Sequence, residues 1–470
     1  MHNSSCNTIT IKIIFLFLFL PSTIISQSQY SVSGKINGCV GKKIFFSKVI
    51  GGQIVKIDSF KLGGNCNFHY SFPDISYKGV FRISVNDSNY ADLIFNKENI
   101  SFETSADKLS TDMEIMESDE NKEYYEYIHK SVPIDDSISL MTELGQKLYN
   151  LNHSKVTAEL NHVAKKITGF EQQKEILADN LTAIYPKSFA SEIINAMLPP
   201  DFKVYQKEKG SVVYPNEKAF LREHFFDNID FSDSNLLHTT VIFDKVGQYF
   251  QYFASPPTVD AYKKAIDFIL IQAAADKNVN DYVMNTLLST FDHSNWEDVY
   301  SYVAEKYLTS STCSNDAKIK KLSEKDNTIK ALKPGNKAPA INVVDLNRKE
   351  QPLDSVKAIY TLVMFWASWC EFCEKAIPEI RNIYDTYKSK GLEIYAVSLD
   401  SIKQSWVEAS KRYNIQWINT CNLKGFKSPV IKDYNIWQTP TFFLLDADKK
   451  IISRPVNTAM LKAELEKINW

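Results

Sequence analysis

The stretch FWASWCEFC, residues 365–373, ends an apolar run with two thiols that are separated by two residues. If a helix begins there, this spacing places Cys373 within one turn of Cys370, as a reversible disulfide requires. Cys370 then lies at the helix N-terminus, where free backbone N–H groups and the helix dipole favour a thiolate. We therefore expect a redox-active pair in which Cys370 is the nucleophile and Cys373 the resolving thiol.

The flanking sequence predicts alternating strands and helices around this pair. Residues 358–365 form an apolar strand-like run, and residues 374–388 repeat apolar side chains at helical spacing. A second strand is expected over 392–399 and an amphipathic helix near 402–413. The order strand, thiols, helix, strand, helix is typical of a βαβ crossover.

Residues 333–470 resemble the thioredoxin-fold domain of envelope thiol-disulfide oxidoreductases of the TlpA/ResA-like branch. The resemblance rests on four pieces in the right order, which are GNKAP at 335–339, FWASWC before the helix, Pro378 inside it, and Thr439-Pro440 before an apolar hairpin. It implies a C-terminal α/β thioredoxin fold and catalysis of thiol-disulfide exchange.

The resemblance also implies where a client protein binds. In this family the proline matching Pro440 forms a cis peptide that faces the thiols, and its neighbouring backbone pairs with an extended client segment. We carry that role to Thr439 and Pro440, and expect Trp369 and Phe372 to contact the client beside them.

Two positions depart from the family pattern. Thioredoxins usually place a buried carboxylate six residues before the first cysteine, where this chain has Met364, and the ResA-like branch often has a glutamate where Ala376 stands. Both proton-relay carboxylates are therefore missing. The sequence leaves the redox poise open between about −270 mV, typical of a reductant, and about −120 mV, typical of an oxidant.

The distribution of histidine and cysteine argues against other chemistry at Cys370. All eight histidines precede residue 333, so a Cys-His hydrolase or a copper-delivery site would lack its imidazole. A zinc site would need two further ligands, and only Cys421 lies in the same domain. The residues before Cys370 also lack the proline and threonine framework of peroxiredoxins. We expect no metal and no cofactor other than the Cys370–Cys373 disulfide.

Length and composition predict a multidomain folded protein. A chain of 470 residues exceeds one ordinary domain, and 44% hydrophobic with 23% charged residues is typical of a chain with ample core. The formal net charge of −2 provides no basic surplus for phosphate neutralisation, which argues against a nucleic-acid partner.

The first 26 residues are typical of a secretory signal peptide. An apolar stretch over 9–20 is followed by Pro21 and polar residues, with cleavage expected after Ser26. The apolar core is shorter than the roughly 20 residues that a membrane span requires. We therefore predict export to the periplasm or cell envelope, with no membrane span after cleavage.

Two further domains are expected before the thioredoxin-like domain. Residues 27–115 alternate apolar and polar positions between glycine and asparagine turns, which predicts a small antiparallel, β-sandwich-like domain. Residues 116–330 change to helical spacing and predict an α-helical domain that positions the redox domain or recruits a client.

Export changes how the remaining cysteines are interpreted, because an oxidising compartment favours disulfides. Cys39 and Cys66 follow and begin predicted strands, so they are candidates for a structural disulfide worth ~3–4 kcal/mol. Cys313 and Cys421 are expected to be buried or free thiols, with a bridge between domains as the alternative.

These observations predict an exported thiol-disulfide oxidoreductase, with reduction favoured over oxidation and a role in cytochrome maturation suggested by the resemblance alone. Its partners would be client protein thiols or disulfides and an upstream redox protein. The alternative is an envelope binding or scaffold protein with a redox-slow thioredoxin domain, which the missing relay carboxylates and the long region before residue 333 favour.

Overall fold

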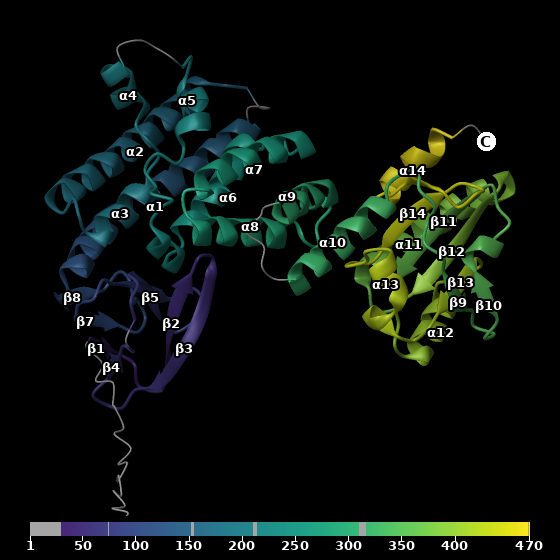
Figure 1. Cartoon of the computed structure of the whole chain (residues 1–470), viewed down its shortest axis with the longest axis horizontal. Coiled ribbons are helices and arrows are strands. Elements are labelled where there is room, and N and C mark those ends of the chain that lie inside the picture. The colour runs from purple at the N-terminus through teal and green to yellow at the C-terminus, as the bar shows by residue number, and fades with distance from the viewer. Residues whose placement is uncertain (1–29, 74, 152–154, 210–213, 310–315, 469) are drawn as a thin grey trace, which may run out of the picture. The chain divides into compact units, whose positions relative to one another are not determined.

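The computed structural model describes residues 30–73, 75–151, 155–209, 214–309, 316–468 and 470 (Figure 1). The expected signal peptide and Cys313 lie outside these residues. The described chain divides into two compact units, the first reaching Ile229 and including Asn235–Ile242, the second comprising Asp230–Ser234 and Phe243–Trp470. The predicted order of a β region, a helical region and a C-terminal α/β region is confirmed. The helices after the β region are shared between the two units.

The β region of the first unit consists, in the described residues, of two four-stranded sheets. One has the order β4-β1-β7-β8 and the other the order β3-β2-β5-β6. Most neighbours are antiparallel, as expected, but β1 and β7 pair in parallel. The strands are β1 (Ser31–Asn37), β2 (Lys43–Ile50), β3 (Gln53–Lys61), β4 (Asn67–Ser71), β5 (Gly79–Ser84), β6 (Tyr90–Phe95), β7 (Ile100–Ser105) and β8 (Glu114–Glu117).

Side chains from both sheets meet in one core. Phe46 of β2 packs against Phe68 of β4 and against Phe81 of β5, with ring centroids 5.7 Å and 5.6 Å apart. All three rings are almost completely buried. Buried residues alternate with more exposed ones along strands such as β4 and β7, and the buried aromatic rings of the two sheets fill the space between the layers.

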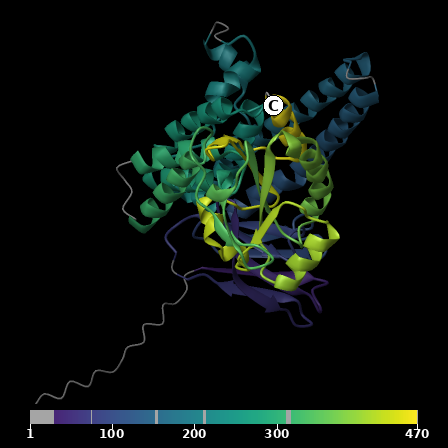
Figure 2. The same ribbon diagram turned by 90° about the vertical axis from the view of Figure 1, so that its right-hand side faces the viewer.

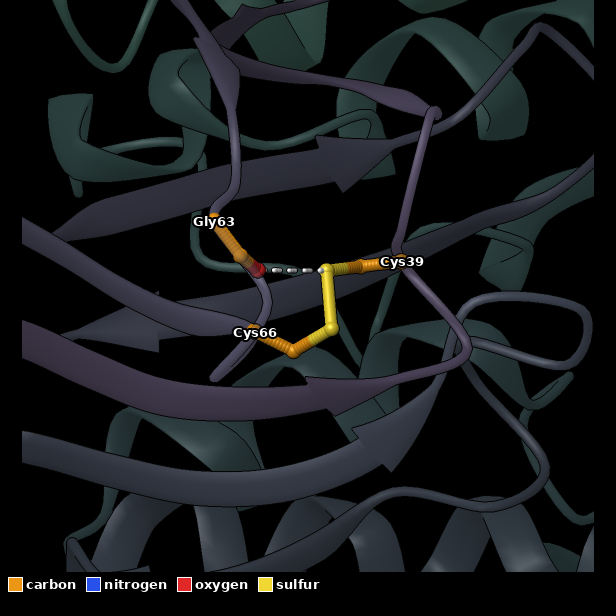
Figure 3. Close-up of a disulfide and its surroundings, with 3 residues drawn as sticks. All are labelled: Cys39, Gly63 and Cys66. Carbon is orange, nitrogen blue, oxygen red and sulfur yellow. Dashed lines mark hydrogen bonds between the residues drawn. A yellow bond between two sulfur atoms is a disulfide. The ribbon is translucent and has the colours of Figure 1, made fainter.

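Cys39 and Cys66 are joined in a disulfide at one end of this core (Figure 3). Their Cα atoms lie 5.8 Å apart, and the sulfur of Cys39 is 3.8 Å from the carbonyl oxygen of Gly63. Both cysteines are buried. The bond connects the segment after β1 to the segment before β4, which closes a loop of 27 residues.

The remainder of the first unit is helical, and its two longest helices pack side by side (Figure 2). The helices are α1 (Asp119–Leu151), α2 (Ala158–Ile184), α3 (Phe189–Met197), α4 (Phe202–Lys209) and α5 (Glu217–His224), followed by a 3-10 turn at Ser234–His238. α1 continues through Pro133, although a proline in the interior of a helix usually kinks or breaks it. Packing against α2 along its length offsets the hydrogen bond that Pro133 cannot donate.

Asn121 connects α1 to the neighbouring sheet. Its side chain is fully buried, accepts a hydrogen bond from the Ile94 N–H at 2.8 Å and donates to the Ile94 carbonyl at 2.7 Å. A buried amide that satisfies both backbone groups of one residue fixes the register between helix and strand.

The helical part of the second unit precedes the α/β region in sequence. It contains α6 (Val241–Phe253, whose first two residues belong to the first unit), α7 (Val259–Ala273), α8 (Lys277–Phe291), α9 (Glu297–Thr309) and α10 (Asp316–Ala331). Leu332, directly after α10, is fully buried in the core of the α/β region. The Gly335 N–H then donates to the Ile451 carbonyl at 2.7 Å, so the connection is tied to the sheet.

The α/β region has a five-stranded sheet of order β13-β12-β11-β14-β15. β12 and β13 run parallel to β11, whereas β14 is antiparallel to it. The elements are β9 (Asn342–Val344), β10 (Glu350–Pro352), β11 (Tyr360–Trp366), α11 (Glu371–Tyr387), β12 (Leu392–Ser398), α12 (Lys403–Arg412), β13 (Ile418–Cys421), α13 (Pro429–Asp433), β14 (Thr441–Leu445), β15 (Ile451–Ser453) and α14 (Thr458–Glu466). The predicted βαβ crossover is confirmed by β11, α11 and β12. Within the described ranges, no helix combines the length and apolar character needed to cross a bilayer.

Replacing Cys39 and Cys66 together by alanine should destabilise the first unit by about 3–4 kcal/mol, because the unfolded chain gains the entropy of the opened loop. Calorimetry of the full chain should show a lower transition temperature for that unit alone. The variant Cys370→Ser/Cys373→Ser, which also removes two cysteines, is the matched control and should leave that transition in place. Equal transition temperatures in both variants would contradict a stabilising role for the disulfide.

Candidate active site

The central strand of the α/β sheet leads directly to the two thiols. Residues 361–366 of β11 are buried, because β12 and β14 flank the strand and helices cover it. Trp366 is fully buried, and its indole N–H donates to Asn419 Oδ1 at 3.1 Å. This buried end of β11 holds the chain in place where it turns into α11.

Cys370 is the N-cap of α11. Its backbone is extended, with φ −94° and ψ 107°, and its sulfur accepts the N–H of Cys373 at 3.1 Å. The exposed acids Glu371 and Glu374 occupy the first turn, as the helix dipole favours. A sulfur that occupies the position of an N-cap oxygen receives a backbone donor that stabilises negative charge on it.

The Thr439–Pro440 peptide lies opposite the thiols and is cis, as the resemblance implied. The thiol of Cys370 is 3.3 Å from the Thr439 carbonyl oxygen and donates to it. Because β14 begins at Thr441 and pairs with β11, the sheet brings this turn to the start of α11.

Cys373 lies behind Cys370 and is withdrawn from solvent. Its side chain is fully buried, whereas Cys370 retains 8% of its surface. Burial raises the pKa of the Cys373 thiol well above its usual range, and the hydrogen bond to Cys370 raises it further. Cys373 is therefore held as a neutral thiol, and Cys370 is the more exposed residue of the pair.

Apolar side chains occupy the two positions where relatives carry acids. Met364 on β11 is 1% exposed and pairs in register with Ala396 and Phe442, and Ala376 is buried on α11. Neither position can accept a proton. The proton of Cys373 must leave by another route.

A groove runs beside the thiols between α11 and the cis-proline turn. It has a volume of about 310 Å³, and its lining includes Phe372, Thr439, Pro440 and Val456. Phe372 is 72% exposed. Trp369, also exposed, turns toward Phe426, with ring centroids 6.1 Å apart. Phe372, Thr439 and Pro440 are thus brought together, while Trp369 and Phe426 form a separate exposed aromatic pair.

Asp400 supports the loop before Cys370 and was not identified from the sequence. It is 1% exposed, and its carboxylate accepts the N–H of Ser368 at 3.1 Å, the hydroxyl of Ser368 at 2.5 Å and the hydroxyl of Ser398 at 2.7 Å. Asp400 lies two residues after the end of β12, and functional residues collect at the carboxyl ends of parallel strands. That rule, applied to the predicted strand over 392–399, would have identified it.

The described residues contain three further cysteines, Cys39, Cys66 and Cys421. Cys39 and Cys66 belong to the first unit. Cys421, at the end of β13, is buried with its sulfur 3.4 Å from the Asp400 carbonyl oxygen, and burial raises the pKa of its thiol. Within the part of the chain that the structure describes, no group of three or more His, Cys, Asp or Glu side chains is placed to hold a metal ion.

Comparison with known proteins places this site in a family. A family model described as AhpC/TSA family matches residues 334–454. The thiol-disulfide oxidoreductase ResA of Bacillus cereus is 33% identical over 132 residues, which are 28% of this chain and 74% of ResA. The chain belongs to the thioredoxin-like thiol-disulfide oxidoreductases.

Two further relatives of this oxidoreductase family are similar to the chain. ResA of Geobacillus kaustophilus is 28% identical over 141 residues, which are 29% of this chain and 79% of that protein. Among solved structures, the thioredoxin domain of a thiol-disulfide oxidoreductase from Bacteroides vulgatus is 32% identical, with a TM-score of 0.28, and the match covers 29% of this chain and 97% of that one.

Replacing Asp400 by alanine should destabilise the α/β region of this oxidoreductase by at least about 2 kcal/mol, because buried Ser398 and the Ser368 backbone lose a charged acceptor. Urea unfolding followed by the fluorescence of Trp369 and its neighbours measures the change. Asp385→Ala removes an exposed carboxylate from α11 and should change stability by less than about 0.5 kcal/mol. Equal effects of both substitutions would show that Asp400 does not hold the loop.

Proposed function

We propose that this chain is an exported thiol-disulfide oxidoreductase that reduces protein disulfides through Cys370 and Cys373. The observation that carries the proposal is the pairing of an N-capping Cys370 sulfur, on a residue that keeps 8% of its surface, with a fully buried Cys373 thiol, opposite the cis-proline turn. This geometry gives the two sulfurs different roles, since one accepts a backbone N–H and meets the client and the other is kept neutral.

The reaction requires two exchanges. The Cys370 thiolate attacks one client sulfur, the client S–S bond breaks, and the departing client thiolate takes up a proton. Cys373 then attacks the Cys370 sulfur of the mixed disulfide, giving up its proton and releasing the second client thiol. Two electrons pass to the client, and the Cys370–Cys373 disulfide awaits an upstream reductant.

The position of Cys373 supports a route for its proton. With Met364 and Ala376 at the positions of the usual acids, the second client thiolate, which departs from Cys370, is the base closest to the reacting sulfurs. We assign the Cys373 proton to this leaving sulfur or to water that reaches it. The resolving step then accelerates with rising pH, since the raised pKa of Cys373 limits the thiolate fraction.

Two observations support an exported location for the proposed activity. The apolar segment before residue 26 is typical of a signal peptide, and the disulfide in the first unit suits an oxidising compartment. We assign the protein to the periplasm or cell envelope, with client proteins and an upstream redox protein as partners. A role in cytochrome maturation rests on family resemblance.

Replacing Cys373 by serine should trap the mixed disulfide, because the second exchange then lacks its nucleophile. Mixed disulfides between the variant chain and client proteins should appear on non-reducing gels of envelope fractions as bands larger than the chain alone. These bands should disappear on reduction, and mass spectrometry should identify the clients. Cys370→Ser, the matched control, should form none.

A failure to trap adducts at any redox buffer, together with no turnover of a model disulfide by the unmodified chain, would contradict the oxidoreductase proposal. That outcome would favour the scaffold alternative, in which the thioredoxin domain binds without exchanging electrons.

A further inference from the structure

A second cavity adjoins the groove on the other side of the cis-proline turn. It has a volume of about 160 Å³. It shares Gln438, Pro440, Phe442 and Val456 with the groove beside the thiols. The two cavities are therefore neighbours around one turn, and an occupant of the groove that extends past Pro440 enters the second cavity.

One wall of this second cavity comes from the helical part of the second unit. Ser294 and Asn295 line it from the connection between α8 and α9, and Glu297 lines it from the first position of α9. The opposite wall includes Asn435, Trp437, Thr441 and Arg454 of the α/β region. Half of the lining residues carry amide, hydroxyl or indole groups and the others are apolar or charged, a mixture that suits the backbone and side chains of a peptide.

An ion pair fixes this wall to the α/β region. The carboxylate of Glu297 accepts two hydrogen bonds from the Arg454 guanidinium, one at 3.1 Å, and a third from the Asn435 amide at 2.7 Å. The Glu297 and Arg454 side chains are only 17% and 24% exposed, and the guanidinium also lies over the Phe443 ring at 4.8 Å. A bidentate pair on an aromatic face holds a defined geometry.

We propose that the α8–α9 connection is part of the client-binding site and contacts the residues that flank the client cysteine. The inference rests on the proposed function, since it takes Cys370 as the sulfur that the client reaches. The occupant is an extended polypeptide segment next to a disulfide. A small disulfide compound fills only the groove beside Cys370, whereas a polypeptide continues past Pro440 and meets Asn295 and Ser294.

The charged side chains that line the second cavity cancel each other, and this limits which client segments the cavity favours. Glu297 and Arg454 neutralise each other, so the cavity offers neither a net anion nor a net cation site. Uncharged flanking residues are therefore favoured there. Apolar contacts come from Phe372 in the groove and from Phe442 and Val456, which line both cavities.

The test compares a protein disulfide with a small one in the full chain. Asn295 is exposed, and Asn295→Trp places a large side chain at the mouth of the second cavity. Insulin and hydroxyethyl disulfide are the two substrates, with dithiothreitol as the electron source. We expect the ratio of kcat/KM for insulin to kcat/KM for hydroxyethyl disulfide to fall at least about fivefold, the usual size of the loss of an important interface contact. Asn278→Trp, at an exposed position in the first turn of α8, is the matched control and should keep the ratio of the unmodified chain.

The possible outcomes distinguish a failure of this inference from a failure of the proposed oxidoreductase function. An unchanged ratio in Asn295→Trp, with both substrates turned over, would overturn the inference and leave the oxidoreductase proposal standing. An equal fall for both substrates would also overturn it, because the loss would not depend on a polypeptide. If the unmodified chain reduced neither substrate, the proposed function would fail, and the inference with it.

Discussion

The N–H of Cys373 donates to the sulfur of Cys370, and the candidate site is organised around that hydrogen bond. This hydrogen bond requires Cys370 to be the N-cap of α11. That position in turn depends on β11 ending at Trp366 and on Asp400, which holds the loop between β11 and α11. It also leaves the Cys370 sulfur directed at the Thr439 carbonyl. The Cys370 sulfur therefore contacts both the turn that the β14–β11 pairing positions and the first turn of α11 that it caps.

Burial sets the difference between the two sulfurs and, with it, the expected direction of electron flow. A dithiol becomes a strong oxidant when its reduced form is stabilised as a thiolate. Here Cys373 is buried and neutral, Met364 and Ala376 are apolar, and the acids nearest in sequence, Glu371 and Glu374, repel negative charge. The Cys373 N–H is the described backbone donor to the Cys370 sulfur. We infer that this balance favours the disulfide form of the pair, as the proposed role of a reductant requires.

The structure could be predicted from the sequence wherever it depends on residues that are close together in the chain. The fold of the α/β region followed from the apolar run before Cys370, the helical spacing after it and the Thr439-Pro440 step, all of which are short-range patterns. Contacts that depend on strand register or on packing between elements were not predictable. Ser368 and Asp400 are 32 residues apart, and Glu297 and Arg454 are 157 apart. The continuity of α1 through Pro133 likewise depends on its packing against α2, which local propensity does not encode.

The reduction potential of the Cys370–Cys373 pair tests most directly whether burial and backbone donation alone govern these thiols. It is measured on the full chain by equilibration in thiol-disulfide buffers and alkylation of the reduced fraction. A value of about −270 mV is expected, since the Cys373 N–H is the described donor to the Cys370 sulfur. A value near about −120 mV would show a strongly stabilised thiolate and contradict this explanation of the site.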